Sequence, residues 1–220
     1  NQIGYIGAFP IPEIKRHANA FAIGAQEVNP DAQVAMRWVY NWFEPAGAAE
    51  ATEALIAEGA DVFVFSEDTP TVIQTAAQRG YPSFSHYASM LEFSPETVVS
   101  GQLVHWDAIV VDFIQGVLDG TYTSQNLEDV DYFWLLAEEA VELGAEPGMP
   151  INPEFEDELK AYTVDHPEFG EISAYDLVFE RLEQMSSDPV EFDPFQGPTY
   201  DRQGNLIYDE GERPTVADLL

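Results

Sequence analysis

The chain has 220 residues, of which 40 are Asp or Glu and only 8 are Lys or Arg, giving a formal net charge of -32. A surface this acidic repels phosphate backbones and anionic lipid headgroups, so nucleic-acid binding and electrostatic membrane attachment are disfavoured. The chain contains no cysteine, which excludes disulfides, thiol catalysis and thiolate zinc sites within it.

The acidic residues are spread along the whole chain rather than gathered in one run. Their mutual repulsion opposes a compact state, and salt relieves it, because the screening length falls to about 3 Å at roughly 1 M salt. We therefore interpret the composition as a salt-adapted surface, with an ordinary acidic protein as the alternative. The first residues already form an apolar strand pattern, and we expect the natural precursor to extend further upstream.

The first hundred residues alternate between strand and helix patterns. Short apolar runs predict five strands, at residues 3–9, 34–40, 61–65, 81–85 and 98–104. Three helices are predicted between these strands, at residues 12–28, 45–59 and 70–80. Each begins with a proline, which suits the first helical turn, and each ends at a glycine or at an Asn-Pro pair. Such alternation with short loops is typical of a parallel sheet with right-handed crossovers.

The second half of the chain has fewer strand patterns. We expect helices at residues 106–118, 154–162 and 173–185, and a hairpin over residues 200–208 that turns at residues 203–205. The turn sequence slightly resembles a calcium loop, but it lacks the alternating acids and the closing Glu of such loops. We therefore interpret it as a hairpin turn.

In an open parallel sheet, ligands bind beyond the carboxyl ends of the strands. This rule selects the loops at residues 9–12, 41–45, 66–69, 86–89 and 105–106. They combine aromatic rings for stacking with a few hydrogen-bonding groups, which suits a small planar ligand. The candidate ligand-binding residues are Phe9, Trp42, Phe43, Ser66, Glu67, Asp68, His86, Tyr87, Ser89 and Trp106.

Several of these residues also have a purely structural interpretation. Trp42 is either a stacking platform for a planar ring or a loop aromatic that covers the sheet end. Thr69 or Asp68 is expected to cap the helix that Pro70 opens. A single histidine such as His86 is often structural or simply exposed.

No enzyme signature is evident in the sequence. The four histidines lack metal-ligand spacing, and there is no nucleophile elbow, phosphate-binding loop or dinucleotide fingerprint. Carboxylate pairs are unavoidable with 40 acids, so they carry little weight for acid-base catalysis. We expect no catalytic residue, no metal and no cofactor.

Long ordered segments of the chain carry a resemblance to a known family. They lie at residues 3–13 (IGYIGAFPIPE), 19–25, 28–32, 42–45 (WFEP), 50–62, 68–70, 118–121, 194–198 (PFQGP) and 201–206. Together they resemble the basic membrane protein family, the purine-nucleoside-receptor-like substrate-binding proteins of ABC transporters.

The resemblance implies an α/β fold, a Rossmann-like parallel-sheet lobe of the type I periplasmic-binding-protein fold with additional C-terminal helices and a hairpin. Residues 1–105 would form the α/β core of a second lobe. Residues 106–220 would be crossing helices and C-terminal segments that complete the lobes. Most of the first lobe would lie upstream, together with a lipid anchor.

The implied function is non-catalytic, extracytoplasmic solute capture for an ABC importer. A purine nucleoside, nucleobase or related planar ligand would bind between two lobes, and Trp42 matches the second-lobe aromatic that stacks on the ring. The closed form would dock on a membrane permease, and the upstream lipid anchor would be the only contact with the membrane. A ligand-sensing receptor or regulatory module, and an α/β enzyme, stay open as alternatives.

The chain departs from the family at the end of the fourth strand. The family often has Gly-x-Asp-x-Asp there, with acids that bind ribose hydroxyls, whereas residues 85–89 read SHYAS. A lysine common near residues 134–143 is also replaced, at about Ala137, and residues 164–172 have no counterpart. These departures argue against an ordinary nucleoside held in the usual way, and leave a free base, a modified nucleoside or another planar ligand.

Overall fold

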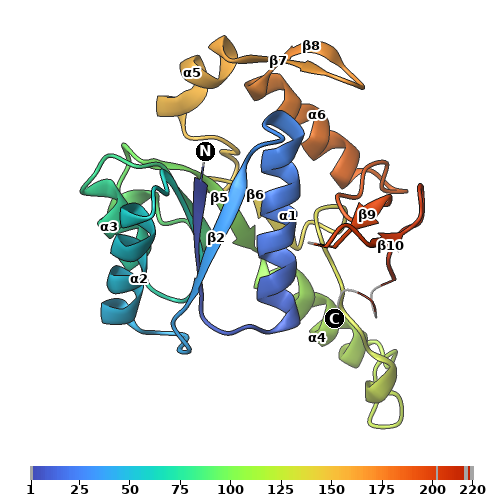
Figure 1. Ribbon diagram of the computed structural model, residues 1–220. Helices are drawn as coiled ribbons and strands as arrows, with labels where there is room; N and C mark the ends of the chain where they lie inside the picture. The colour runs from blue at the N-terminus through green and yellow to red at the C-terminus, as the bar shows by residue number, and fades with distance from the viewer. Residues whose placement is uncertain (1, 202, 216–217, 219–220) are drawn as a thin grey trace.

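The computed structural model describes residues 2–201, 203–215 and 218. Its main feature is a six-stranded sheet with helices on both faces (Figure 1). The strand order is β2-β1-β3-β4-β5-β6. These strands are β1 (Gln2–Gly7), β2 (Gln33–Trp38), β3 (Val62–Ser66), β4 (Ser83–Tyr87), β5 (Val98–Val104) and β6 (Val141–Leu143).

The first five strands pair in parallel, as the sequence predicts, whereas β6 runs antiparallel to β5. The short β6 strand was not predicted. The alternating helices are α1 (Pro12–Val28), α2 (Pro45–Ala57) and α3 (Thr71–Ala77). Proline occupies the first turn of α1 and of α2, because its fixed φ suits a helix start and its missing N–H has no helical partner there.

Side chains of alternate residues in the central strands enter two different cores. Ile3 and Tyr5 of β1 face α1, where they pack with Ile14 and Ala18. Ile6 points to the opposite face and packs with buried side chains of α2 and α3. This period of two is what a strand with helices on both sides requires, and it fixes which face each helix covers.

The second half of the chain reaches both ends of the sheet (Figure 1). After β5 come α4 (Trp106–Leu118) and, beyond β6, α5 (Glu156–Ala161) and α6 (Ala174–Ser186). Two antiparallel hairpins accompany them, β7 (Thr163–His166) with β8 (Gly170–Ser173), and β9 (Thr199–Tyr200) with β10 (Leu206–Tyr208). Helix α5 and the β7–β8 hairpin lie at the top of Figure 1, and α4 lies at the bottom. Short 3-10 segments complete the structure: η1 (Leu91–Phe93), η2 (Leu127–Asp129) and η3 (Pro153–Phe155).

Most predicted elements are confirmed, although the bounds of several need correction: the strands predicted at residues 3–9 and 34–40 end two residues earlier, and the helix predicted at residues 70–80 spans Thr71–Ala77. The fourth strand begins and ends two residues later than predicted, at Ser83–Tyr87, because polar serines interrupt the apolar run that signals its position. The predicted helix at residues 154–162 is a 3-10 turn followed by a short helix. Residues 164–172, which had no counterpart in the resemblance, lie mainly in the β7–β8 hairpin. The hairpin predicted over residues 200–208 is present as β9 and β10, although Arg202 in its turn lies outside the described residues.

Arg181 of α6 attaches the C-terminal segments to α1. Its guanidinium donates to the Glu27 carboxylate at 2.8 Å and to the Glu168 carboxylate at 2.8 Å. The same guanidinium lies 4.0 Å above the Phe192 ring and 5.0 Å above the Phe169 ring. Because the arginine is mostly buried, these contacts are shielded from solvent more than an ordinary surface pair.

Gly101 of β5 lies directly opposite Ser85 of β4. A Cβ at residue 101 would lie 2.5 Å from the Ser85 Cβ and 2.8 Å from its carbonyl oxygen, so Gly101→Ala should lower the free energy of unfolding by about 1–3 kcal/mol. The control is Gly24→Ala in α1, where nothing lies within 4 Å and alanine should stabilise the helix by up to about 1 kcal/mol. Urea unfolding followed by circular dichroism measures both, and equal stabilities would contradict the packing described.

The net charge of -32 predicts that salt stabilises the folded chain. Screening weakens repulsion among carboxylates, and a gain of about 1 kcal/mol raises the melting temperature of a domain this size by about 2–4 °C. We therefore expect thermal melts to shift upward by several degrees between roughly 0.05 M and 2 M KCl. A melting temperature that stays constant over this range would contradict the interpretation as a salt-adapted surface.

Candidate functional site

The five predicted loops lie at one edge of the sheet, because the five parallel strands all end there. Two of the predicted loop residues, His86 and Tyr87, are in fact the last residues of β4. Their backbone positions are therefore fixed by strand pairing with Gln102 and Leu103 of β5. The described contacts place the candidate residues in two groups along this edge.

The first group lies beyond β1, β2 and β3. The rings of Phe9 and Trp42 have centroids 5.3 Å apart with an interplanar angle of 56°. The Asp68 backbone N–H donates to the Trp42 carbonyl oxygen at 2.7 Å, which ties the loop after β3 to the loop after β2. The Trp42 side chain is 41% exposed and Phe43 64% exposed, so both present aromatic surface to solvent.

The polar residues at the end of β3 are engaged within the protein. The Ser66 hydroxyl shares a hydrogen bond with the Tyr5 hydroxyl, and both residues are buried. The carboxylate of Glu67, also buried, accepts hydrogen bonds from the Thr69 backbone N–H at 3.0 Å and from the Thr69 hydroxyl at 2.9 Å. Ser66 and Glu67 therefore support the loop rather than present free hydrogen-bonding groups.

The expected cap of the third helix takes a different form. Helix α3 begins at Thr71 with Pro70 as its N-cap residue, and Pro70 supplies no side-chain hydrogen bond. The Thr69 hydroxyl accepts the Thr71 backbone N–H at 3.2 Å, so Thr69 does satisfy a donor at the start of the helix. Asp68 does not cap the helix, and its side chain is exposed at the sheet edge.

The second group lies at the ends of β4 and β5. The Tyr87 ring stacks on the His86 ring with centroids 3.9 Å apart, and meets the Trp106 ring edge-on at 6.1 Å. The Tyr87 hydroxyl donates a hydrogen bond to the Glu13 carboxylate of α1. Tyr87 has a φ of +60°, an unfavourable conformation for a tyrosine, which its packing and hydrogen bond maintain.

His86 is buried and uncharged. Burial, with a smaller effect from His17, lowers its pKa to about 3. The Gln102 side-chain amide lies 2.9 Å from the His86 Nδ1, and with the amide as donor the ring proton is on Nε2. Burial likewise lowers the pKa of His17. The centroids of the His17 and Tyr87 rings are 6.1 Å apart. A neutral imidazole can donate and accept hydrogen bonds without placing a charge in the site.

Ser89 and Trp106 have different orientations. The Ser89 hydroxyl donates to the Ala145 carbonyl at 2.7 Å, so it holds the segment after β6 against the end of β4. Trp106 is the first residue of α4, and its side chain is 60% exposed. Trp106 therefore adds another open aromatic surface to the edge, whereas Ser89 does not add a free hydroxyl.

The sequence analysis missed two residues of this cluster. Glu13 is adjacent to Pro12 in the first turn of α1, and so follows the loop after β1 directly. Gln102 is a polar side chain inside strand β5, where an apolar residue is usual. This unusual position was the signal in the sequence that could have identified Gln102. No local pattern could have identified Glu13, because its hydrogen bond with Tyr87 joins residues 74 positions apart.

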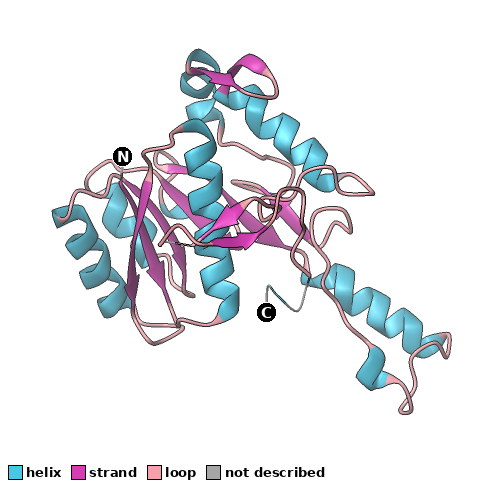
Figure 2. Ribbon diagram, turned by 45° about the vertical axis from the view of Figure 1, so that its right-hand side comes forward, coloured by secondary structure: helices cyan, strands magenta, loops and turns pink. Residues whose placement is uncertain are grey.

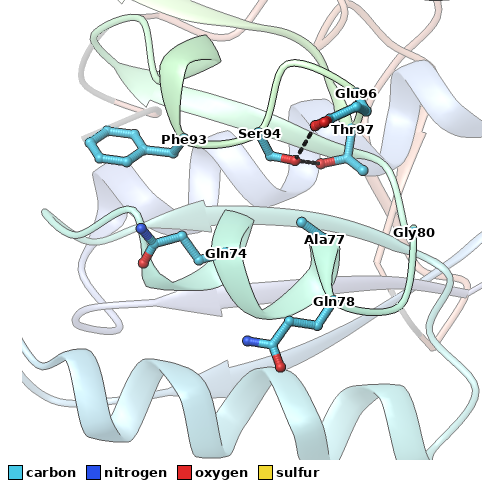
Figure 3. Close-up of a pocket in the computed structure, with 8 residues that line it drawn as sticks. All are labelled: Gln74, Ala77, Gln78, Gly80, Phe93, Ser94, Glu96 and Thr97. Carbon is cyan, nitrogen blue, oxygen red and sulfur yellow. Dashed lines mark hydrogen bonds between the residues drawn. The ribbon is translucent and has the colours of Figure 1, made fainter.

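A separate hollow of about 490 Å³ lies at the opposite edge of the sheet (Figure 3). Its walls come from the end of α3 and from the turn before β5, including Gln74, Gln78, Phe93 and Thr97. It is broadly open to solvent and contains none of the predicted site residues. We therefore do not assign it to the ligand.

Within the described part of the chain, no three His, Asp or Glu side chains gather closely enough to hold a metal ion. Over the same residues, no helix has the length and apolar character needed to cross a membrane.

Glu67 gives the site edge a pH-dependent stability. Burial raises its pKa from 4.5 to about 7, although the bonds from Thr69 act in the opposite direction. The folded state therefore holds the proton more tightly, and the contribution of this group to stability is lost as pH rises from about 4.5 through about 7. Glu67→Gln removes this loss. The free energy of unfolding of the variant, relative to that of wild type, should therefore rise by about 2–3 kcal/mol between roughly pH 5 and pH 8.

Urea unfolding at both pH values measures this difference. The control is Glu128→Gln, which removes the same charge from an exposed position in η2. The control isolates the general effect of removing one carboxylate from a very acidic protein. If both variants show the same pH dependence relative to wild type, burial of Glu67 does not have the effect described.

Comparison with known proteins gives a family match over most of the chain. Residues 1–171 match the family described as ABC transporter substrate-binding protein, PnrA-like. A purine-binding protein of Brucella abortus is 32% identical over 217 residues, which cover 99% of this chain and 54% of that protein. A Haloferax volcanii protein, named as a candidate glucose-binding protein of an ABC transporter, is 35% identical over 73% of this chain and 40% of its own length.

Solved structures agree on the fold. A solute-binding protein of an ABC transporter system from Conexibacter woesei superposes with a TM-score of 0.59 at 13% identity. The match covers 88% of this chain and 57% of that structure. The chain therefore spans about half the length of the relatives it matches.

Proposed function

The chain belongs to the family of PnrA-like ABC transporter substrate-binding proteins, and from this premise we propose that it captures a planar heterocycle, first of all a purine base or nucleoside, for an ABC importer. The family and the fold predicted from the sequence are confirmed. The type I periplasmic-binding-protein fold is shared with the Conexibacter woesei structure. The ligand and the residues that bind it are our proposal.

One observation carries the choice of a planar ligand. At the carboxyl edge of the sheet, the polar side chains of Ser66, Glu67 and Ser89 are engaged in hydrogen bonds within the protein. The aromatic surfaces of Trp42 and Trp106 are instead exposed. An edge with open rings and few free polar groups favours stacking on a flat heterocycle.

A small number of groups at this edge can provide direction for hydrogen bonds. Asp68 has an exposed carboxylate that can accept from ring N–H or amino groups. The Tyr87 hydroxyl donates its proton to Glu13, so its oxygen is left to accept a hydrogen bond beside Trp106. A small number of polar groups beside exposed rings suits the ring nitrogens and amino groups of a purine better than the many hydroxyls of a sugar.

A hexose is the second candidate ligand, because the Haloferax volcanii relative is named for glucose. Sugar sites also use aromatic stacking, but they need several polar side chains free to bind hydroxyl groups. The internal hydrogen bonds of Ser66, Glu67 and Ser89 leave few such groups on this lobe. The hexose is therefore included in the binding test as a competing ligand.

The proposed role is non-catalytic and extracytoplasmic. A ligand that contacts both lobes of the whole protein would favour a closed form, and that form would dock on the transporter permease. Support comes from the family and from the name of the Brucella abortus relative, which refers to purine binding. A lipid anchor on the whole protein would keep it at the membrane surface.

Trp42→Ala tests the stacking role in the polypeptide extended to the length of its relatives. Loss of ring stacking should weaken binding of the cognate purine by at least about fivefold, equivalent to about 1 kcal/mol. Isothermal titration with adenine, guanine, hypoxanthine, adenosine and glucose measures the affinities. Tyr162→Ala is the control, because Tyr162 is a comparably exposed aromatic located after α5 and away from the sheet edge.

The outcomes of this titration are separable. Unchanged purine affinity in Trp42→Ala would remove Trp42 from the site. Binding of glucose without any purine would overturn the proposed ligand class. Native mass spectrometry of the protein purified from its own host adds an unbiased check, because a purine retained from the host would appear as an added mass.

A further inference from the structure

Tyr87 is held in an unusual backbone conformation at the end of β4. Its φ of +60° lies in the left-handed region, which bulky side chains rarely adopt. Backbone strain of this kind persists only where the surrounding contacts maintain it, and it is concentrated at functional sites. The Tyr87 side chain is only partly buried, so it remains open to contact with another molecule. The strain therefore points to a functional use of this side chain.

The Tyr87 ring is fixed by its neighbours. The His86 ring stacks against it with centroids 3.9 Å apart and an interplanar angle of 23°. His86 is itself held by the Gln102 side-chain amide, 2.9 Å from its Nδ1. The His17 ring meets Tyr87 edge-on from α1, with centroids 6.1 Å apart. The phenol oxygen of Tyr87 consequently has a defined position.

Trp106 connects Tyr87 with the edge where we place the ligand. Figure 2 shows α4 extending outward from the sheet. Its first residue, Trp106, follows directly on the end of β5 and has a side chain that is 60% exposed. The Trp106 and Tyr87 rings are nearly perpendicular, at 88°, with centroids 6.1 Å apart. The rim of a planar ligand that packs on Trp106 can therefore reach the Tyr87 side chain.

The hydrogen bond to Glu13 determines what Tyr87 offers to such a ligand. A tyrosine hydroxyl has one proton, and Tyr87 donates it to the Glu13 carboxylate. Glu13 lies in the first turn of α1, where the helix dipole favours a negative charge. Burial raises the pKa of Tyr87, and the bond to Glu13 and the Glu13 charge raise it further, although Arg16 acts in the opposite direction. The phenol oxygen thus keeps its proton directed at Glu13 and presents only lone pairs elsewhere.

Asp68, at the other group of candidate residues, has the same character. Its exposed side chain is a carboxylate, which accepts hydrogen bonds, and its backbone N–H is used by the Trp42 carbonyl oxygen. Both polar groups that we assign to the ligand are therefore acceptors. A ligand that satisfies them must supply N–H donors from its rim.

We propose that Tyr87 is a specificity-determining residue that selects a heterocycle with an exocyclic amino group. This inference rests on the proposed purine-binding function and narrows the class of ligand. An amino N–H donates to the phenol oxygen, whereas an analogue without the amino group leaves that oxygen unpaired in a water-poor site. Glu13 acts through Tyr87 as a positioning residue, because it takes the hydroxyl proton that would otherwise allow Tyr87 to donate.

Isothermal titration with two pairs of purines tests the selection in the polypeptide extended to the length of its relatives. Adenine and 6-methylpurine differ by an amino group at one carbon, and guanine and hypoxanthine differ by an amino group at another. Wild type should bind the amino-bearing member of at least one pair about tenfold or more tightly than its partner. In Tyr87→Phe this preference should fall below about threefold, while the affinity for the other member changes by less than about twofold.

The comparison within a pair separates selection from a structural effect. If Tyr87 only supported the fold, Tyr87→Phe would weaken both members of a pair equally, and the proposal would be overturned. Tyr162→Phe is the control, because it removes the same hydroxyl from a 56% exposed ring after α5 and should leave the preference unchanged. Equal affinities within both pairs in wild type, or a preference that survives Tyr87→Phe, would also overturn the proposal.

Nuclear magnetic resonance of ¹³C-labelled tyrosine in the 220-residue chain tests the hydrogen bond without ligand. Tyr87→Phe identifies the Tyr87 signal, and Glu13→Leu removes the acceptor. Because Glu13 raises the pKa of Tyr87, the signal should titrate at lower pH in Glu13→Leu than in wild type, and an unchanged titration would contradict the role of Glu13. A wild type that binds no purine would overturn the proposed function together with this inference. That failure is recognised from wild type alone, whereas the failures specific to Tyr87 require that purines bind.

Discussion

The parallel pairing of β1 with β2 and β3 is the constraint on which the rest of the structure depends. It places alternate side chains of β1 in two different cores, with Tyr5 toward α1 and Ile6 toward α2 and α3. Parallel pairing also requires each connection to return to the starting edge, so all five strands end on the same side. Residues as distant in sequence as Phe9 and Trp106 therefore belong to one edge of the sheet.

This edge contains two kinds of residue with different roles. Hydrogen bonds such as Ser66 to Tyr5 and Ser89 to Ala145 satisfy buried polar groups and hold the loops in place. The rings of Trp42 and Trp106 are instead exposed to solvent. The loops at this edge are thus held by internal hydrogen bonds while their aromatic rings stay exposed. Recognition of a flat ligand would therefore require little ordering of the loops on binding.

Local signals account for the parts of the fold that could be predicted. Helix α1 has the predicted bounds because Pro12 sets its start and the Asn29–Pro30 pair prevents its continuation. Strand β4 was misplaced by two residues because its serines and histidine give no apolar run. The three-residue strand β6 and the contacts of Glu13 and Gln102 depend on tertiary pairing, so local patterns could not predict them.

The few cations of this acidic chain mainly connect separate elements. Arg37 of β2 pairs with Glu58 after α2, Arg79 after α3 pairs with Glu53 of α2, and Arg181 joins α6 to α1. The exposed pairs of Arg37 and Arg79 add little free energy individually, so the fold relies on its two apolar cores.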